Sequence, residues 1–510
     1  MLRRSVFVPV LALYVVLGTP SLAQVTGDHV TSLPPHSLFG WAVTIHGEFA
    51  AISAPGERHG EMNASGAVYV YHQRQGEWKF FQRIVPADPG MMKLFGTSIK
   101  LQDNRLLVGA PGDNAKTGAV YVYTYDGASW IEERKLTPRN GTSFQKFGTH
   151  VDMGYGIVLV GSAANGIGDS ATGSVTIFTL GTTDWAESTV VSPLEQSNDL
   201  FGASAVVVSK DEILIGAPRA NGSVPHCGAV YSFRRHGDTW KPDQVLESSQ
   251  PMSEGLFGCS LGYSTERVLV GAMQEVVDSV HSGVAYTFLR SDAGQWAGES
   301  RLVPDTLRNQ DYFGMSVALN GNLAFIGAPK WEEGRLRGNV DMGRVLAFTF
   351  SQGEWKSLGG IVPIDGRDDD HFGMAIASNE NSVLIGSRLH DKVEFNDGAA
   401  YFYKADEIYP ELSNSIIPAT YSLGQNYPNP FSTNTVIRYD LPDRAYVSIA
   451  IYDVYGREVC TLMAGMQEAG RWQVFWNGRD NLTGAVPSGV YMYRLATPYF
   501  SSMRKLMLLR

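Results

Sequence analysis

Cysteine is scarce in this sequence, which contains three: Cys227, Cys259 and Cys460. Three are too few for the disulfide framework that small secreted proteins use in place of a large core. Cys227 and Cys259 either pair with each other or are idle, buried thiols. Cys460 lies in the apolar run REVCTLM, so we expect it to pack in a core.

Motifs for metal binding and nucleophilic catalysis are also missing. The 11 histidines include no pair at the i, i+4 spacing of a helical zinc site, and no Cys-x-x-Cys occurs. No Gly-x-Ser-x-Gly turn lies between a strand and a helix. The sequence therefore predicts no metal, no cofactor and no catalytic residue, and we expect a protein that is not an enzyme.

Positive charge is in deficit, because 41 Lys and Arg face 51 Asp and Glu, for a formal net charge of -10. An acidic field does not attract nucleic acid or anionic membrane surfaces, so neither is expected as a partner. With 44% hydrophobic and 18% charged residues, the chain is long and apolar enough to fold into more than one domain.

Long apolar runs are absent except near the start. Arg3 and Arg4 precede an apolar run over residues 6–17, and Ser21, Leu22 and Ala23 follow it. This order predicts a signal peptide over residues 1–23, cut between Ala23 and Gln24. A membrane anchor would need about 20 apolar residues, more than the run over residues 6–17 has. No other stretch has an apolar run that is longer, so we expect no transmembrane segment in the mature chain.

Helical periodicity is absent too, and what the sequence has instead is a repeat. A Phe-Gly pair recurs seven times, at intervals of 52 to 59 residues. The pairs are Phe39-Gly40, Phe95-Gly96, Phe147-Gly148, Phe201-Gly202, Phe257-Gly258, Phe313-Gly314 and Phe372-Gly373.

Each copy contains short runs rich in Val, Ile, Tyr and Phe, bounded by Gly, Pro, Asn and Asp, which is the composition of strands and turns. In six copies a Trp marks a fourth run. A four-stranded sheet cannot bury both its faces alone, so the sheets must stack, and a closed ring removes the exposed ends. The sequence predicts a seven-bladed β-propeller of four-stranded blades over residues 24–409. In each pair the Gly would permit close backbone approach and the Phe would wedge between sheets.

The seventh copy ends at GAAYFYKADEIYP without a Trp-marked run. Before the first Phe-Gly pair, HVTSLPPHSLFG aligns through Leu33 and Pro34 with the ends of other fourth runs, such as Val85 and Pro86. We therefore expect the N-terminal segment to supply the outer strand of the last blade.

The chain from Val25 to Asp406 resembles FG-GAP repeats, the units of the integrin α-chain propeller and of many exported bacterial proteins. In integrins, several turns between first and second strands carry calcium loops, since this cation needs six to eight oxygens. Here those turns are as short as HGE and QDN. The resemblance therefore does not extend to calcium.

After a linker at residues 410–420, residues 421–510 alternate short β runs with turns, which predicts a small immunoglobulin-like β-sandwich. This segment resembles the C-terminal sorting domain of the type IX secretion system. The residues that carry the resemblance are Asn426, Pro428, Asn429, Pro430, Gly456 in IYDVYGREV, Trp476, Gly489 in SGVYMYRL, and Lys505. The resemblance implies that the type IX machinery is a partner and that the protein is secreted or displayed on the outer cell surface.

Two loops hold candidate side chains. Asp368, Asp369, Asp370 and His371 in GRDDDHFG could form a cation site or an acid/base pair, or could simply be a solvated loop. Trp331, Arg335 and Arg337 in KWEEGRLRGNVDMG could hold a ligand, or could be an exposed insertion.

The loops between second and third runs vary most between copies, and in a propeller they share one face with the loops that join the blades. A rigid ring with diverse loops predicts non-catalytic binding or adhesion, with an extracellular protein or glycan as the ligand. The alternative is an extracellular polysaccharide hydrolase or lyase. Two carboxylates within about 5 to 10 Å of each other in the channel would favour the alternative.

Overall fold

The computed structural model describes residues 25–26, 36–74, 76–163, 173–181, 185–193, 198–264, 266–291, 293–332, 341–363, 366–390, 397–404, 421–426, 429–432, 435–467, 470–481 and 484–509. The predicted signal peptide with its cleavage site at Ala23 and Gln24, the Leu33-Pro34 pair, the linker, Arg335, Arg337 and Pro428 lie outside these residues.

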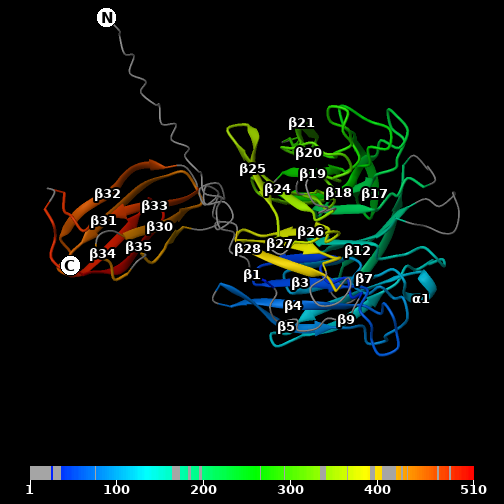
Figure 1. Cartoon of the computed structure of the whole chain (residues 1–510), viewed down its shortest axis with the longest axis horizontal. Helices are drawn as coiled ribbons and strands as arrows, with labels where there is room; N and C mark the ends of the chain where they lie inside the picture. Colours follow the sequence, from blue (N-terminus) through cyan, green and yellow to red (C-terminus); the bar gives the residue numbers. More distant parts are fainter. Residues whose placement is uncertain are drawn as a thin grey trace, which may run out of the picture.

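The fold is all-β, and the described strands up to Lys404 form four-stranded antiparallel sheets, which we number 1 to 7 in chain order (Figure 1). Sheet 1 contains β2 (Val43–His46), β3 (Phe49–Ala54), β4 (Ala67–Arg74) and β5 (Glu77–Ile84). Sheet 2 contains β6 (Ile99–Gln102), β7 (Arg105–Ala110), β8 (Ala119–Tyr125) and β9 (Trp130–Leu136). Sheet 3 contains β10 (His150–Gly154), β11 (Ile157–Ser162), β12 (Ser174–Leu180) and β13 (Trp185–Val191).

Sheets 4 and 5 are β14 (Ser204–Ser209), β15 (Glu212–Ala217), β16 (Ala229–His236) and β17 (Thr239–Leu246); and β18 (Phe257–Ser264), β19 (Arg267–Ala272), β20 (Val284–Arg290) and β21 (Trp296–Leu302). Sheets 6 and 7 are β22 (Ser316–Asn320), β23 (Leu323–Ala328), β24 (Arg344–Ser351) and β25 (Glu354–Ile361); and β26 (Phe372–Ser378), β27 (Ser382–Ser387), β28 (Ala399–Lys404) and β1 (Val25–Thr26). A single helical turn, α1 (Asp113–Lys116), lies between β7 and β8. No helix in the described ranges has the length and apolar character needed to cross a bilayer.

Burial follows the order of strands within each sheet. The second strands β11, β15, β23 and β27 are buried at every residue, because neighbouring sheets cover both of their faces. Most residues of the fourth strands β5, β9 and β25 are exposed or half-buried. This difference explains why the second runs are continuously apolar and the fourth runs are mixed.

The first strands form a closed series of contacts. β2 contacts β6, β6 contacts β10, and the series continues through β14, β18, β22 and β26 back to β2. Four-stranded antiparallel sheets joined side by side through their first strands are consistent with a β-propeller.

The Phe-Gly pairs lie where neighbouring sheets meet. All seven Phe side chains are buried; Phe95, for example, shares a core cluster with Val68 and Val70 of sheet 1. Each Gly of a pair has a positive φ, between 85° and 96°. A Cβ on Gly314 would lie 2.6 Å from the Val284 carbonyl oxygen of the preceding sheet, so this backbone approach excludes any side chain.

The N-terminal segment completes sheet 7, as predicted. β1 pairs antiparallel with β28, with Val25 opposite Phe402 and Thr26 opposite Tyr401 (Figure 1). The junction continues at Ser37, whose Oγ donates to the Asp397 carbonyl oxygen at 2.7 Å. The first and last segments of the ring are therefore joined by hydrogen bonds.

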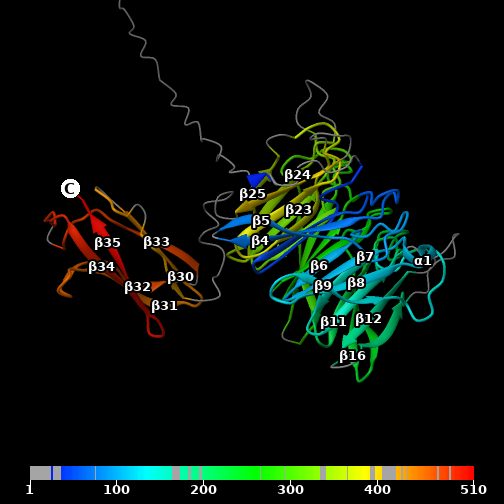
Figure 2. The same cartoon turned by 90° about the horizontal axis from the view of Figure 1, so that it is seen from below.

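Strands after residue 420 form two further antiparallel sheets. One contains β29 (Ser422–Leu423), β30 (Thr435–Leu441) and β33 (Gly470–Trp476); the other contains β31 (Ala445–Tyr452), β32 (Glu458–Gln467), β34 (Gly489–Ala496) and β35 (Ser501–Leu508). Both sheets contribute to one core around Trp476, separate from the cores of sheets 1 to 7. Figure 2 shows these strands in orange and red as a body of their own.

The three cysteines are free thiols. Of the two alternatives for Cys227 and Cys259, the structure shows the unpaired one. Cys460 is buried in the core around Trp476, which confirms its predicted packing role.

Candidate functional site

The first candidate site is the cavity at the centre of sheets 1 to 7. It has a volume of about 790 Å³ and is lined by the first strands of all seven sheets. The lining is mixed: it has apolar side chains such as Val206, Leu261 and Ile376, and it also has polar and charged side chains. Side chains also tie neighbouring first strands together here, because Thr44 Oγ1 accepts from the Leu101 N–H at 3.0 Å.

Two carboxylates, Asp103 and Asp152, are among the lining residues. Asp152 is buried, its Oδ1 lies 2.6 Å from Lys100 Nζ, and its Oδ2 accepts from the Val207 N–H at 2.8 Å. Asp103 Oδ1 lies 3.3 Å from His46 Nε2. Each lining carboxylate thus faces a basic side chain of the neighbouring sheet.

His150 also contributes to this lining. Its Nε2 lies 2.8 Å from the Ala205 carbonyl oxygen, and burial lowers the pKa of the ring. The neutral imidazole therefore donates to a backbone carbonyl of the next sheet, which is a structural role.

The second candidate site is the set of loops at the sheet junctions. At each junction the same three positions recur in the sequence. The first is the residue two places before the Gly that precedes a third strand. The second and third are the residues three places and one place before the Phe of the next Phe-Gly pair. We call these three positions the junction triple. The two positions before Phe have a positive φ at all seven junctions. At the junctions of sheets 1 and 2, 2 and 3, and 6 and 7, the N–H just before the Phe donates to the carbonyl oxygen of the first position, as from Leu94 to Ala64 at 3.0 Å. At these junctions the backbone brings the three positions together while the chemistry of their side chains varies.

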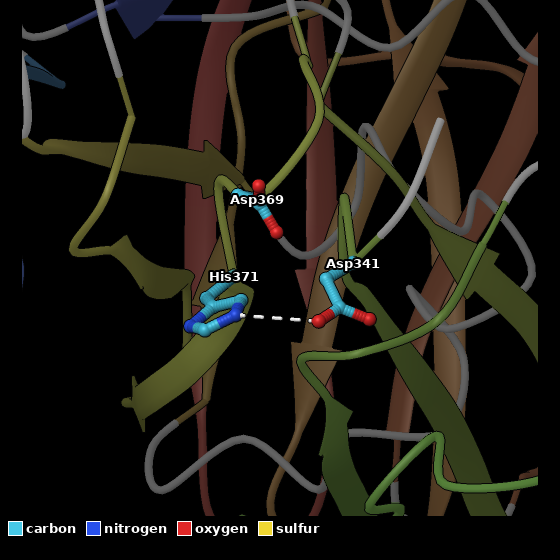
Figure 3. A group of neighbouring side chains, drawn as sticks. All are labelled: Asp341, Asp369 and His371. Atoms are coloured by element: carbon cyan, nitrogen blue, oxygen red, sulfur yellow. Dashed lines mark ion pairs between the residues drawn. The ribbon is translucent and has the colours of Figure 1, made fainter. Parts of the chain in front are cut away.

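At the junction of sheets 6 and 7 the triple is Asp341, Asp369 and His371 (Figure 3). One carboxylate oxygen of each Asp and one ring nitrogen of His371 lie within 4.8 Å of one another. His371 Nε2 is 3.8 Å from Asp341 Oδ2, and the His371 N–H donates to the Asp341 carbonyl oxygen at 3.1 Å. Burial, reinforced by the positive Arg388, lowers the pKa of His371, so its ring is neutral at pH 7.

The predicted run GRDDDHFG divides into inward and outward side chains. Asp370 is buried, and its Oδ2 lies 2.9 Å from His390 Nδ1. Asp368 and Asp369 are exposed. The structure thus brings Asp369 and His371 together but assigns Asp370 to the interior. Sequence reasoning missed Asp341, whose signal is its place two residues before Gly343.

Basic and aromatic side chains surround this triple. Lys330 Nζ is 3.5 Å from Asp341 Oδ2 and lies over the Tyr312 ring at 5.2 Å. Trp331 packs against the core of sheets 5 and 6, and the guanidinium groups of Arg308 and Arg344 each lie 5.2 Å from its ring centre. Trp331 is therefore engaged in packing.

Other junction triples carry different groups. Between sheets 4 and 5, His226 Nδ1 lies 2.6 Å from Glu254 Oε1, and Leu256 fills the third position. Between sheets 2 and 3, Lys116 Nζ lies 5.1 Å from the centre of the Phe144 ring. The loops thus present a different surface at each junction.

One Gly-x-Ser-x-Gly run, at residues 258–262, lies inside β18. Its Ser260 Oγ donates to the Gly314 carbonyl oxygen of the next sheet at 2.7 Å. Because the serine joins two sheets from within a strand, it lacks the strand-to-helix turn of a hydrolase nucleophile.

Most of the described residues of the predicted sorting motif contribute to the C-terminal sheets and their core. Asn426 is buried and its Nδ2 donates to Thr435 Oγ1 at 2.9 Å, while Asn429 Oδ1 accepts from the Met507 N–H at 2.8 Å. Trp476 is in the core, Gly456 occupies a turn with φ 78°, and Gly489 opens β34. Lys505 is exposed on β35.

Comparison with known families supports the repeat. The model of the FG-GAP repeat matches residues 35–71, 78–123, 296–347 and 355–403. The chain carries FG-GAP repeats. The matched segments contain the pairs at Phe39, Phe95, Phe313 and Phe372, and the three remaining FG-GAP-like copies form sheets with the same strand order.

No curated protein matches the chain. Among solved structures, one described as PorZ, an essential bacterial surface component of the type-IX secretion system of Porphyromonas gingivalis, is 12% identical, with a TM-score of 0.28. The match covers 92% of this chain and 75% of that one. A TM-score this low decides neither fold nor function.

Proposed function

We propose that the protein is an exported, non-catalytic binding or adhesion protein, built on a seven-bladed β-propeller whose blades are sheets 1 to 7. Its ligand is an extracellular protein or glycan bound at the loop face. The closed contacts of the first strands and the different junction triples support this proposal, because they combine a rigid ring with varied side chains.

The observation that carries the proposal is the pairing of the cavity carboxylates. A glycosidase needs one carboxylate as an acid and a second as a base or nucleophile, each free to act on the substrate. Here Asp152 is bound to Lys100 and to a backbone N–H, and Asp103 faces His46. The cavity lining therefore favours binding over hydrolysis or lyase chemistry.

We propose further that residues 421–510 are an immunoglobulin-like sorting domain, recognised by the type IX machinery after a signal peptide has directed the chain across the inner membrane. The two sheets with a shared core support a folded recognition module. The motif residues Asn426 and Trp476 stabilise it, and exposed Lys505 is available to a partner. The mature protein would then be secreted or held on the outer surface.

The test combines a glycan array with a panel of chromogenic glycosides, both applied to the purified exported chain. We expect saturable binding without turnover. Lys116→Ala, which removes the basic member of the junction between sheets 2 and 3, and Glu254→Gln, at the junction of sheets 4 and 5, would map the binding face. Turnover of any glycoside, abolished by Asp152→Asn, would overturn the proposal.

A further inference from the structure

The junction of sheets 6 and 7 differs chemically from the other junctions whose triples are fully described. At this junction all three positions carry side chains that can ligate a metal: Asp341, Asp369 and His371. The triple between sheets 4 and 5 has two such side chains and Leu256, and the triple between sheets 1 and 2 consists of Ala64, Met92 and Leu94.

We propose that Asp341, Asp369 and His371 form a binding site for a divalent transition-metal cation of the zinc type (Figure 3). One imidazole nitrogen and two carboxylate oxygens are ligands that Zn²⁺ takes in proteins, and three protein ligands leave the fourth position open to water or an external ligand. Ca²⁺ fits less well, because it needs six to eight oxygens and does not favour imidazole.

The distances are close to those of a formed site. Ligands at about 2.0 to 2.2 Å from a tetrahedral Zn²⁺ lie roughly 3.4 Å from one another. The three donor atoms lie within 4.8 Å, and His371 Nε2 is 3.8 Å from Asp341 Oδ2. Because the Asp369 side chain is exposed, its rotation can bring the set to binding distance without moving the backbone.

Lys330 is the group that competes with a metal. Its ammonium is 3.5 Å from Asp341 Oδ2, longer than a hydrogen bond, and a third of its side chain is exposed, so the flexible stem can move away. The guanidinium of Arg388 lies 4.6 Å from the centre of the Trp41 ring, and its positive charge acts on His371, so Arg388 also opposes a bound cation. Asp370 does not compete for the metal, because it is engaged with His390.

A bound cation would connect two parts of the chain that are far apart in sequence. Asp341 lies before β24 of sheet 6, whereas Asp369 and His371 lie just before β26 of sheet 7. The metal would thus join neighbouring sheets at the loop face and offer its open position to a carboxylate-bearing or imidazole-bearing ligand.

The test is calorimetric titration of ZnCl₂ into the purified exported chain after chelator treatment. We expect one saturable site in the wild type and at least about a tenfold loss of affinity in Asp369→Asn and in His371→Gln, since each removes one of three ligands. Lys330→Met, which removes the competing ammonium, should bind Zn²⁺ several times more tightly.

Glu254→Gln and His226→Gln are the matched controls, because they remove ligating groups at the same kind of junction between sheets 4 and 5. Both should bind Zn²⁺ as the wild type does, and Zn²⁺ should raise the melting temperature of the wild type and of the controls but not of His371→Gln. A wild type without saturable binding, or equal losses in the controls and in the site variants, would overturn the proposal.

Discussion

Single glycines set how closely neighbouring sheets can approach. Gly271 lies near the end of the second strand of sheet 5, and an added Cβ would lie 1.9 Å from the Gly314 carbonyl oxygen of sheet 6. Gly109, Gly216 and Gly327 make the equivalent approach in sheets 2, 4 and 6. The backbone of one sheet is therefore in direct contact with the backbone of the next.

Gly271→Ala should lower the free energy of unfolding by about 3 kcal/mol or more, because the new methyl group would push sheets 5 and 6 apart. Gly321→Ala is the control: its φ of +56°, unlike the backbone conformation of Gly271, is unusual for alanine, but nothing lies within 4 Å of the added Cβ. It should cost only about 1 kcal/mol. Urea denaturation of the two variants measures the difference, and equal losses would contradict it.

Glu275 is a second residue whose surroundings predict a measurable effect. It is buried and accepts a short hydrogen bond from the Tyr286 hydroxyl, and burial raises its pKa from its ordinary 4.5 to about 7. At a pH between these two pKa values, Glu275 keeps its proton in the folded protein and releases it in the unfolded chain. The free energy of unfolding therefore falls as pH rises through this window.

Glu275→Gln removes this titration and keeps an oxygen that can accept from Tyr286. The wild type should lose up to about 3 kcal/mol of stability as the pH rises from about 5 to about 8, and the variant should not. The difference in the free energy of unfolding between variant and wild type should therefore shift by that amount in favour of the variant. Urea denaturation at both pH values measures the change. A stability difference between variant and wild type that does not depend on pH would refute the raised pKa.

The sequence predicted the places of residues that recur in every copy. It did not predict which side chains meet at a single junction. The Phe-Gly pairs, the apolar second strands and the Trp-marked fourth strands repeat at a fixed order, so their places follow from alignment of the copies. Asp341 precedes a different strand from Asp369 and His371, so the sequence alone could not show that they meet. The structure shows it through the backbone hydrogen bond and the side-chain contact between Asp341 and His371. The direction of Asp370 toward His390 likewise depends on tertiary contacts.

At the scale of the elements, we expect the short strand β1 to stabilise the ring. It covers the edge of β28, which would otherwise present unpaired backbone N–H and C=O groups. The sequence predicted this pairing because the seventh copy lacks its own fourth run. It did not predict the register shifts that recur between third and fourth strands, at Val70/Tyr71, Val122/Tyr123 and Ala347/Phe348. Such irregularities leave no mark in the pattern of alternation.

A chain that begins at His36 should have a lower melting temperature than a chain that begins at Gln24, and should aggregate more readily. The physical reason is that both the β1–β28 hydrogen bonds and the cover of the β28 edge are lost. Differential scanning calorimetry and light scattering of the two proteins provide the measurement. Identical melting and scattering would show that β1 does not stabilise the ring.

At the scale of the whole molecule, the cores fall into two groups. The cluster around Trp476 contains residues from Leu423 to Leu508 only, whereas the remaining clusters involve sheets 1 to 7. Residues 421–510 also contain nine Lys and Arg against six Asp and Glu, a balance of +3 that leaves -13 for the rest of the total of -10. From the separate cores we expect two independent folding units.

The full chain should therefore unfold in two calorimetric transitions. Truncation after Lys404 should remove one of them and leave the other at its original temperature, since no core residue of sheets 1 to 7 is lost. The Trp476→Ala exchange tests the same division in the full-length chain, because it should destabilise only the C-terminal body, by about 3 kcal/mol or more. A single transition shared by all these proteins would contradict the division.

The pairing of β1 with β28 also bears on how fast the molecule folds. Val25 and Phe402 are partners although almost the whole ring separates them along the chain. Contacts between such distant residues form slowly, because their entropy cost precedes any gain from packing. Sheet 7 can be completed only after the last residues of β28 have been synthesised, so the first strand of the chain has to wait for its partner until nearly all of sheets 1 to 7 has been made.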